Sequence, residues 1–275
     1  MIKRGDTMAT YNGKCVYNAI AVGKVTVYKR QEISVNRTKI ENIENEIQRL
    51  ENAKALAIEQ LRKIYKKALK VVGEANAQIF EIHMMMVEDY DYNDAILETI
   101  KSQRVNAEYA VLVTAKNFAD MFAAMDDSYM RARAADIHDI SNRIIACLTN
   151  NEIVNNITDE KQIICADDLF PSETVCLDKD KVLAIVAAYG SPHSHTAILA
   201  RNMNIPLLIG VGEEFLNTVK DGDIAIVNGF TGEFILNPDD ETVKSAVQKR
   251  NEENERRGFC KNSKLIRYPF QPLLC

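Results

Sequence analysis

Residues 182–203 read VLAIVAAYGSPHSHTAILARNM, in which an apolar segment passes through a turn into a second apolar segment of different spacing. Val182–Ala187 is rich in Val and Ile and has the length of a buried strand. Thr196–Met203 follows a turn that contains Gly and Pro, and its composition favours a short helix. A strand followed closely by a helix is the repeating unit of an α/β layer. We therefore predict the α/β fold class for this part of the chain.

Strand–helix alternation extends to both sides of this segment. Further strands are predicted at Lys161–Ala166, Pro206–Val211 and Asp223–Asn228, a hairpin over residues 228–237, and short helices at Ser172–Leu177 and Glu214–Val219. Tyr17–Tyr28 is also strand-like. Since an isolated first hairpin is only marginally stable, we expect residues 1–30 to pair with the C-terminal sheet.

The segment from about residue 35 to residue 147 has a different pattern, with a single Gly and no Pro. Its apolar residues recur every three or four positions, as in amphipathic helices. Breaks at Gly73, residues 89–93, Ser102 and residues 126–128 predict about four long helices in an antiparallel bundle. The expected domains are an α/β domain from residues 1–30 and 149–240, an inserted helical domain at 31–148, a linker helix at 241–258, and an atypical tail at 259–275.

Composition excludes several classes of protein. The formal charge is −5, and residues 1–248 hold 36 acidic and 27 basic side chains, so no basic nucleic-acid binder is expected. No stretch has the ~18 apolar residues of a membrane helix, and the N-terminus lacks the apolar run of a signal peptide. The six cysteines include no Cys-x-x-Cys pair, so neither a zinc site nor a disulfide framework is expected. This use of cysteine favours a location in the reducing cytoplasm.

The histidines of the turn between strand and helix are the strongest candidates for chemistry. His193 and His195 precede a helix, where unpaired N–H groups and the helix dipole favour anions such as phosphate. A mostly neutral imidazole can accept a phosphoryl group, with the hydroxyls of Ser194 and Thr196 beside it. The alternatives are that Ser194 only caps the helix and His195 is a surface residue, or that His-x-His is half of a metal site without a third ligand.

Three other features have simpler structural interpretations. His83 and His138 are expected to be partly exposed helix histidines. Residues 171–174 have the pattern of a helix start, and the loop of residues 170–174 is expected to border that of His195. Met84, Met85 and Met86 are consecutive, so at least one should be exposed on a helix and could belong to an interaction surface.

Four segments resemble the Enzyme I family, the phosphoenolpyruvate-protein phosphotransferases of the bacterial sugar phosphotransferase system. They are residues 194–210, 168–174, 133–140 and 79–89, in the family's order and spacing over residues ~14–255. The sequence departs from the family at Phe170, where Thr is common, and at residues 190–193, Gly-Ser-Pro-His, where the family usually has two Gly and a Thr.

The resemblance implies a swivelling α/β phosphohistidine domain with an inserted helical domain that binds the phosphocarrier protein HPr. His195 would carry the phosphoryl group from phosphoenolpyruvate to a histidine of HPr, in sugar uptake. The same resemblance implies that Thr174 and Ser194 orient the site and that Arg133 and Asp136 face it from the inserted domain. Thr196 offers a further hydroxyl beside His195, His193 is a candidate second donor to the phosphoryl group, and no metal ligand is expected. It also implies an HPr surface that includes His83, Met85, Met86 and Asp89.

Full-length members of the family continue into a barrel that binds phosphoenolpyruvate and Mg²⁺ and forms the dimer. The tail at 259–275 does not resemble the family's route into that barrel. We therefore expect no cofactor in this chain, with Mg²⁺ only alongside the barrel, and exchange with phospho-HPr in place of autonomous reaction with phosphoenolpyruvate. The alternatives are the mobile histidine domain of a pyruvate phosphate dikinase or phosphoenolpyruvate synthase, which lacks the helical insert, and a non-catalytic HPr-binding module.

Overall fold

The computed structural model describes residues 8–30, 33–151 and 160–263, with side chains to residue 256. Within these ranges the chain forms one mixed sheet of eight strands in the order β1-β8-β7-β3-β4-β5-β6-β2, together with nine helices. The strands are β1 Ala9–Asn12, β2 Lys14–Cys15, β3 Ile20–Val27, β4 Gln162–Ala166, β5 Val182–Ala187, β6 Leu207–Ile209, β7 Ile224–Asn228 and β8 Glu233–Leu236.

The centre of the sheet is parallel, from β3 through β4 and β5 to β6. All five residues of β4 are buried, as in strands covered on both faces. The strands from the first 30 residues join this sheet, because β3 pairs with β4 and β7, β1 with β8, and β2 with β6. The α/β class and the pairing of residues 1–30 with the C-terminal sheet are therefore confirmed.

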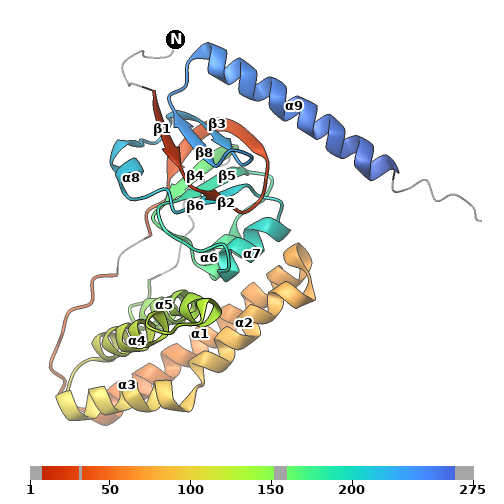
Figure 1. Cartoon of the computed structure of the whole chain (residues 1–275). Coiled ribbons are helices and arrows are strands. Elements are labelled where there is room, and N and C mark those ends of the chain that lie inside the picture. Colours follow the sequence, from red (N-terminus) through yellow and green to blue (C-terminus); the bar gives the residue numbers. More distant parts are fainter. Residues whose placement is uncertain (1–7, 31–32, 152–159, 264–275) are drawn as a thin grey trace, which may run out of the picture.

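Three short helices follow the parallel strands: α6 Pro171–Cys176, α7 His195–Asn202 and α8 Glu214–Thr218. Each begins within one residue of the helix predicted from the sequence. Figure 1 shows α6 and α7 on the side of the sheet that faces the helical bundle. They place the turn of His195 between the two parts of the molecule.

The helical segment contains five helices among the described residues, not about four. They are α1 Ile43–Val72, α2 Glu74–Val87, α3 Tyr90–Gln103, α4 Ala107–Ala123 and α5 Ser128–Leu148. Gly73, at φ 80°, ends α1 and precedes α2, which are separated by this residue alone. Asp89 and Asp127 accept hydrogen bonds from the first-turn N–H groups of α3 and α5, so these predicted breaks are helix caps.

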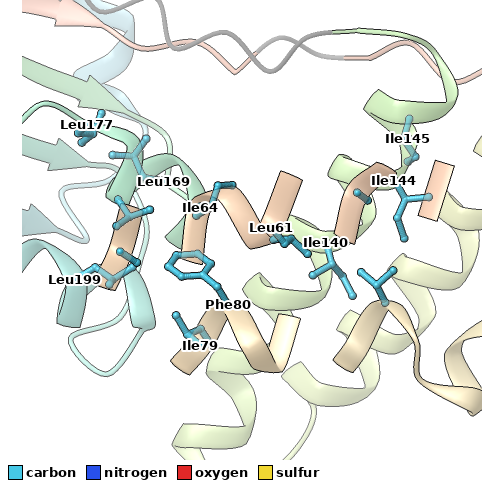
Figure 2. Packing of buried hydrophobic residues seen from close by; sticks show 14 of the residues in the cluster. Leu61, Ile64, Ile79, Phe80, Ile140, Ile144, Ile145, Leu169, Leu177 and Leu199 are labelled. Carbon is cyan, nitrogen blue, oxygen red and sulfur yellow. The ribbon is translucent and has the colours of Figure 1, made fainter. Parts of the chain in front are cut away.

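A single hydrophobic cluster connects the bundle to the sheet layer. It includes Ile64 of α1 and Phe80 of α2 from the bundle, and Leu169 and Leu199 from the α/β layer. Figure 2 shows these side chains gathered at the junction of the two parts. Since each fully buried side chain of this size contributes about 1.5–3 kcal/mol, this packing holds α6 and α7 against α1 and α2. A separate cluster containing Phe215 and Phe234 covers other residues of the sheet.

The charged helix predicted at 241–258 is present as α9, Asp240–Ser263, and therefore continues beyond the predicted end. Ala246 is buried on this helix, which contacts β3. Most of the predicted tail, residues 264–275, lies outside the described residues. Among the helices that the structure describes, none has the length and apolarity required to cross a membrane.

Candidate functional site

The turn between β5 and α7 places His195 at the first residue of a helix. Gly190 has a φ of 109°, which favours glycine at this turn. Ser194 is the N-cap residue of α7, and its hydroxyl accepts a hydrogen bond of 3.2 Å from the Ala197 N–H. The interpretation of Ser194 as a cap is confirmed, and the cap fixes the backbone that presents His195 beside the N-terminal end of the helix dipole.

The His195 ring contacts Asp136 of α5, in the helical bundle. Nδ1 of His195 lies 3.2 Å from Oδ2 of Asp136, an ion-pair distance. The side chain of Asp136 is 1% exposed and that of His195 is 16% exposed. Because Nδ1 faces the carboxylate, Nε2 is the ring nitrogen left for chemistry.

Asp136 is ionised in this environment in spite of its burial. Burial alone raises the pKa of a carboxyl group, but the His195 and His83 imidazoles lower it more, so that the pKa of Asp136 falls to about 2. The site therefore contains a fixed negative charge next to His195. Such a charge stabilises positive charge that develops on the imidazole ring.

Arg133 is connected to His195 through Tyr129, which the sequence analysis did not select. Nη2 of Arg133 donates a 2.6 Å hydrogen bond to the Tyr129 hydroxyl, and the guanidinium lies 5.0 Å from the centre of the Tyr129 ring. Tyr129 meets the His195 ring edge to face at a centroid distance of 6.3 Å. Tyr129 lies at the start of α5, four residues before Arg133, and this spacing on a helix was the sequence feature that could have indicated their contact.

The remaining hydroxyls bind the loop before α6. Thr196 donates a 2.6 Å hydrogen bond to the Leu169 carbonyl, so the loop before α6 borders α7 as expected. Thr174 is fully buried and donates to the Phe170 carbonyl at 2.9 Å. These bonds direct both hydroxyls to backbone carbonyls.

The helix-start interpretation of residues 171–174 is confirmed by Glu173. Its carboxylate accepts from the Phe170 N–H at 2.7 Å and from the Tyr28 hydroxyl at 3.0 Å. Arg30 donates to the same carboxylate through Nε and Nη2, at 2.8 and 2.9 Å, and stacks 3.7 Å from the centre of the Phe170 ring. Phe170, a departure from the family pattern, thus forms the platform for this ion pair.

The expected position of His83 is wrong: it is 0% exposed, neither partly exposed nor on the surface. Its Nε2 lies 3.3 Å from Oδ1 of Asp136, and its Nδ1 lies 3.9 Å from Oδ2 of Asp139. The helical period predicted a boundary position, but α5 packs across this side of α2. Asp139 and Ser172 belong to residues 133–140 and 168–174, which resemble the family, but neither was predicted to be a site residue.

The other predicted docking residues differ in exposure. Met85 is 69% exposed, whereas Met86 is half-buried against the bundle, so the expectation of at least one exposed methionine is confirmed. Asp89 is exposed and caps α3 by accepting from the Tyr92 N–H at 2.9 Å. His193 and His138 are exposed, in the turn before α7 and on α5.

Two other features do not involve His195. The described residues contain no group of three or more His, Cys, Asp or Glu side chains arranged to hold a metal ion. A pocket of about 710 Å³ lies between the bundle and the sheet layer, beside Arg30, Glu173 and Ser172. His195 is not among its lining residues, so the pocket does not define the candidate site.

Two family models match the chain. The model described as "PEP-utilising enzyme, N-terminal" matches residues 12–133, and the model described as "PEP-utilising enzyme, mobile domain" matches residues 158–232. The second match contains His195 and the first contains His83.

Similar proteins carry one shared name. The chain is 38% identical over 242 residues to the phosphoenolpyruvate-protein phosphotransferase of Geobacillus stearothermophilus, covering 88% of this chain and 42% of that protein. The protein of the same name from Enterococcus faecalis (strain ATCC 700802 / V583) is 39% identical and is covered to 40%. The chain thus spans about two fifths of the length of these curated relatives.

A solved structure matches both parts of the molecule together. It is the NMR solution structure of Enzyme I (nEIt), with a TM-score of 0.70 and 35% sequence identity. The match covers 89% of this chain and 99% of that one.

Proposed function

The chain belongs to the Enzyme I family of PEP-utilising phosphotransferases, and on that premise we propose that it transfers a phosphoryl group through His195. The donor and acceptor would be phosphoenolpyruvate and the phosphocarrier protein HPr in sugar uptake, as the names of the relatives and the resemblance suggest. The chain would act in the cytoplasm. Any Mg²⁺ would bind with the phosphoenolpyruvate site and not to residues of this chain.

One observation carries the proposal: His195 lies at the start of α7, and its Nδ1 faces the ionised Asp136 of α5. An imidazole that carries its proton on Nδ1, the nitrogen toward the carboxylate, has its lone pair on Nε2, the form required of a nucleophile. The carboxylate then stabilises the positive charge that the ring gains as phosphorus binds.

The step with HPr is balanced without another reactant. Nε2 of His195 forms a bond to phosphorus as the bond from phosphorus to one ring nitrogen of the phospho-HPr histidine breaks, roughly in line. The HPr histidine carries a proton on its other ring nitrogen and therefore leaves as a neutral imidazole. The Nδ1 proton of His195 stays on the ring, and no net proton is gained or lost. The reverse step uses the same geometry, so the exchange is reversible.

The domain assignment is part of the proposal. Residues 1–30 and 149–240 would form the phosphohistidine domain, residues 31–148 the HPr-binding domain, and residues 241–258 a linker. The exposed Met85 and Asp89 on the bundle support a docking surface, with Met86 at its buried edge. Arg133 and Tyr129 would line the side of the site nearest the partner.

The test is transfer of labelled phosphate from ³²P-phospho-HPr to the purified chain. We expect the wild type and a His138→Ala control, altered at an exposed histidine of α5, to take up label that is stable in alkali and labile in acid. A His195→Ala protein should take up none. His193→Ala should slow transfer if His193 donates to the phosphoryl group, and an unchanged rate would remove that role.

The same experiment separates the proposal from the non-catalytic alternative. A wild-type chain that binds phospho-HPr tightly yet acquires no label would be a binding module, and the proposed transfer would be wrong. Label that persists in His195→Ala would place the phosphoryl group on another residue.

A further inference from the structure

Two buried carboxylates of α5 lie beside the two ring nitrogens of His83. Asp136 lies 3.3 Å from Nε2 and Asp139 lies 3.9 Å from Nδ1, and all three side chains are at most 3% exposed. The Phe80 ring packs edge to face on the imidazole at 5.8 Å. His83 therefore cannot touch a docking protein without rearrangement of the bundle.

Each of these carboxylates also reaches across to the α/β layer. Asp136 contacts His195 of α7. Asp139 accepts from the backbone N–H of Ser172 at 3.0 Å and from its hydroxyl at 2.6 Å, at the start of α6. The result is a buried polar chain that runs from His195 through Asp136, His83 and Asp139 to Ser172.

The donors available to the two carboxylates differ. Asp139 has both Ser172 groups, and Arg143 lies 4.0 Å from it while donating to the Ser172 hydroxyl at 2.9 Å. For Asp136 the neighbouring donors are the two imidazoles. A buried carboxylate with only one donor is costly, and it can rotate about its Cβ–Cγ bond or take up water. A proton on Nε2 of His83 therefore gives Asp136 a second donor, whereas Asp139 has donors of its own.

Resting on the proposed function, we propose that His83 is a positioning residue for phosphoryl transfer: it fixes the Asp136 carboxylate against Nδ1 of His195, so that Nε2 is presented to phosphorus. It acts through Asp136 and does not touch the partner. This differs from the docking role that the resemblance implies for His83, and the two roles predict different kinetic effects.

The kinetic test compares His83→Leu, which removes the donor at similar volume, with His83→Gln, whose amide can still donate to Asp136. We expect His83→Leu to lower kcat for transfer from phospho-HPr about 10- to 100-fold, as for other residues that orient a reacting group, with KM within about twofold of wild type. His83→Gln should recover part of the loss. His138→Leu, on the exposed face of α5, is the matched control and should change neither constant.

Imidazole ¹⁵N spectra of the wild-type chain test the proposal without any variant. His195 should carry its proton on Nδ1 and His83 on Nε2, and His83→Leu should shift the His195 ring toward a mixture of tautomers. Wild-type His83 with its proton on Nδ1 alone would overturn the proposal, because it could not donate to Asp136. A raised KM with unchanged kcat in His83→Leu would overturn it in favour of docking.

The two proposals can fail separately. If the wild type takes up no label, the proposed transfer fails, while the tautomers still report whether His83 orients His195. If the wild type transfers normally and both His83 variants match it in kcat, the transfer stands and the positioning role is wrong.

Discussion

His83 and Met85 are two residues apart on α2, yet His83 has no exposed surface and Met85 is 69% exposed. A two-residue step turns a helix by more than half a revolution, so the two side chains point in opposite directions. One face of α2 therefore supports the site from inside, and the other is available to a partner.

The first prediction concerns the partner surface. Met85→Ala should raise KM for phospho-HPr about 3- to 10-fold with kcat unchanged, because it removes exposed apolar contact and leaves the buried network intact. Initial rates of label transfer at varied phospho-HPr give both constants. Leu56→Ala, altered at another exposed apolar residue of the bundle, is the control. An unchanged KM would move the docking surface away from Met85.

The second prediction concerns the orientation of His195. Asp136→Asn should lower the rate of label transfer by about 10² to 10⁴, because an amide can present N–H to Nδ1 and so place the ring proton on Nε2. Binding of phospho-HPr, measured by calorimetry, should be little changed. A variant rate within about twofold of wild type would show that the Asp136 contact is not used in transfer.

The third prediction concerns encounter with HPr. Residues 1–248 carry 36 acidic against 27 basic side chains, so a partner with a basic face would be attracted over long range. We expect the association rate constant, measured by stopped flow, to fall roughly several-fold as the NaCl concentration is raised from about 50 to about 500 mM. An association rate independent of salt would contradict this electrostatic contribution.

Much of the fold follows from local pattern. Several features depend on residues that are near one another in sequence, and the structure has them as predicted. They are the strand, turn and helix of residues 182–203, the breaks at Gly73 and Asp127, and the cap at Ser194. The number of helices was underestimated because each predicted break separates two helices completely.

The site was harder to predict because it depends on contacts between distant segments. Asp136 and His195 are 59 positions apart, and their proximity was expected only through the family resemblance. The burial of His83 depends on how α5 packs against α2, which helical periodicity cannot determine. Arg30 had no sequence signal, since its partner Glu173 is 143 residues away.

The fourth prediction is a pH dependence of stability. In the folded protein the pKa of Asp136 is about 2. Burial raises this pKa, but His195 and His83 lower it by more than burial raises it, so it lies below the usual ~3.9 of an unfolded Asp. Folding therefore favours the ionised carboxyl, and this stabilisation is complete above about pH 4 and is lost as the pH falls toward 2.

Urea unfolding of the wild type and Asp136→Asn at pH 5, 4, 3 and 2 measures this effect. The difference between the two free energies of unfolding should shift by about 2 kcal/mol against the wild type as the pH falls from 5 to 2. Parallel pH profiles of the two proteins would show that the folded Asp136 has an ordinary pKa.

The fifth prediction concerns the ion pair that joins Arg30, in the segment after β3, to Glu173 of α6. The Glu173 carboxylate is 4% exposed and accepts from Arg30, the Tyr28 hydroxyl and the Phe170 N–H. Glu173→Gln replaces one acceptor oxygen by a donor and leaves the Arg30 guanidinium beside a neutral amide. The free energy of unfolding should fall by about 2–4 kcal/mol, as when one partner of a largely buried pair is removed.

Glu160→Gln is the matched control, because Glu160 pairs with Lys24 at 2.9 Å but both side chains are more than half exposed. Its urea midpoint should equal that of the wild type, since solvent screens such a pair. If Glu173→Gln also matched the wild type, Arg30 would be solvated well enough to do without its partner. The contact between the segment after β3 and the start of α6 would then depend on the stacking of Arg30 on Phe170 and on apolar packing.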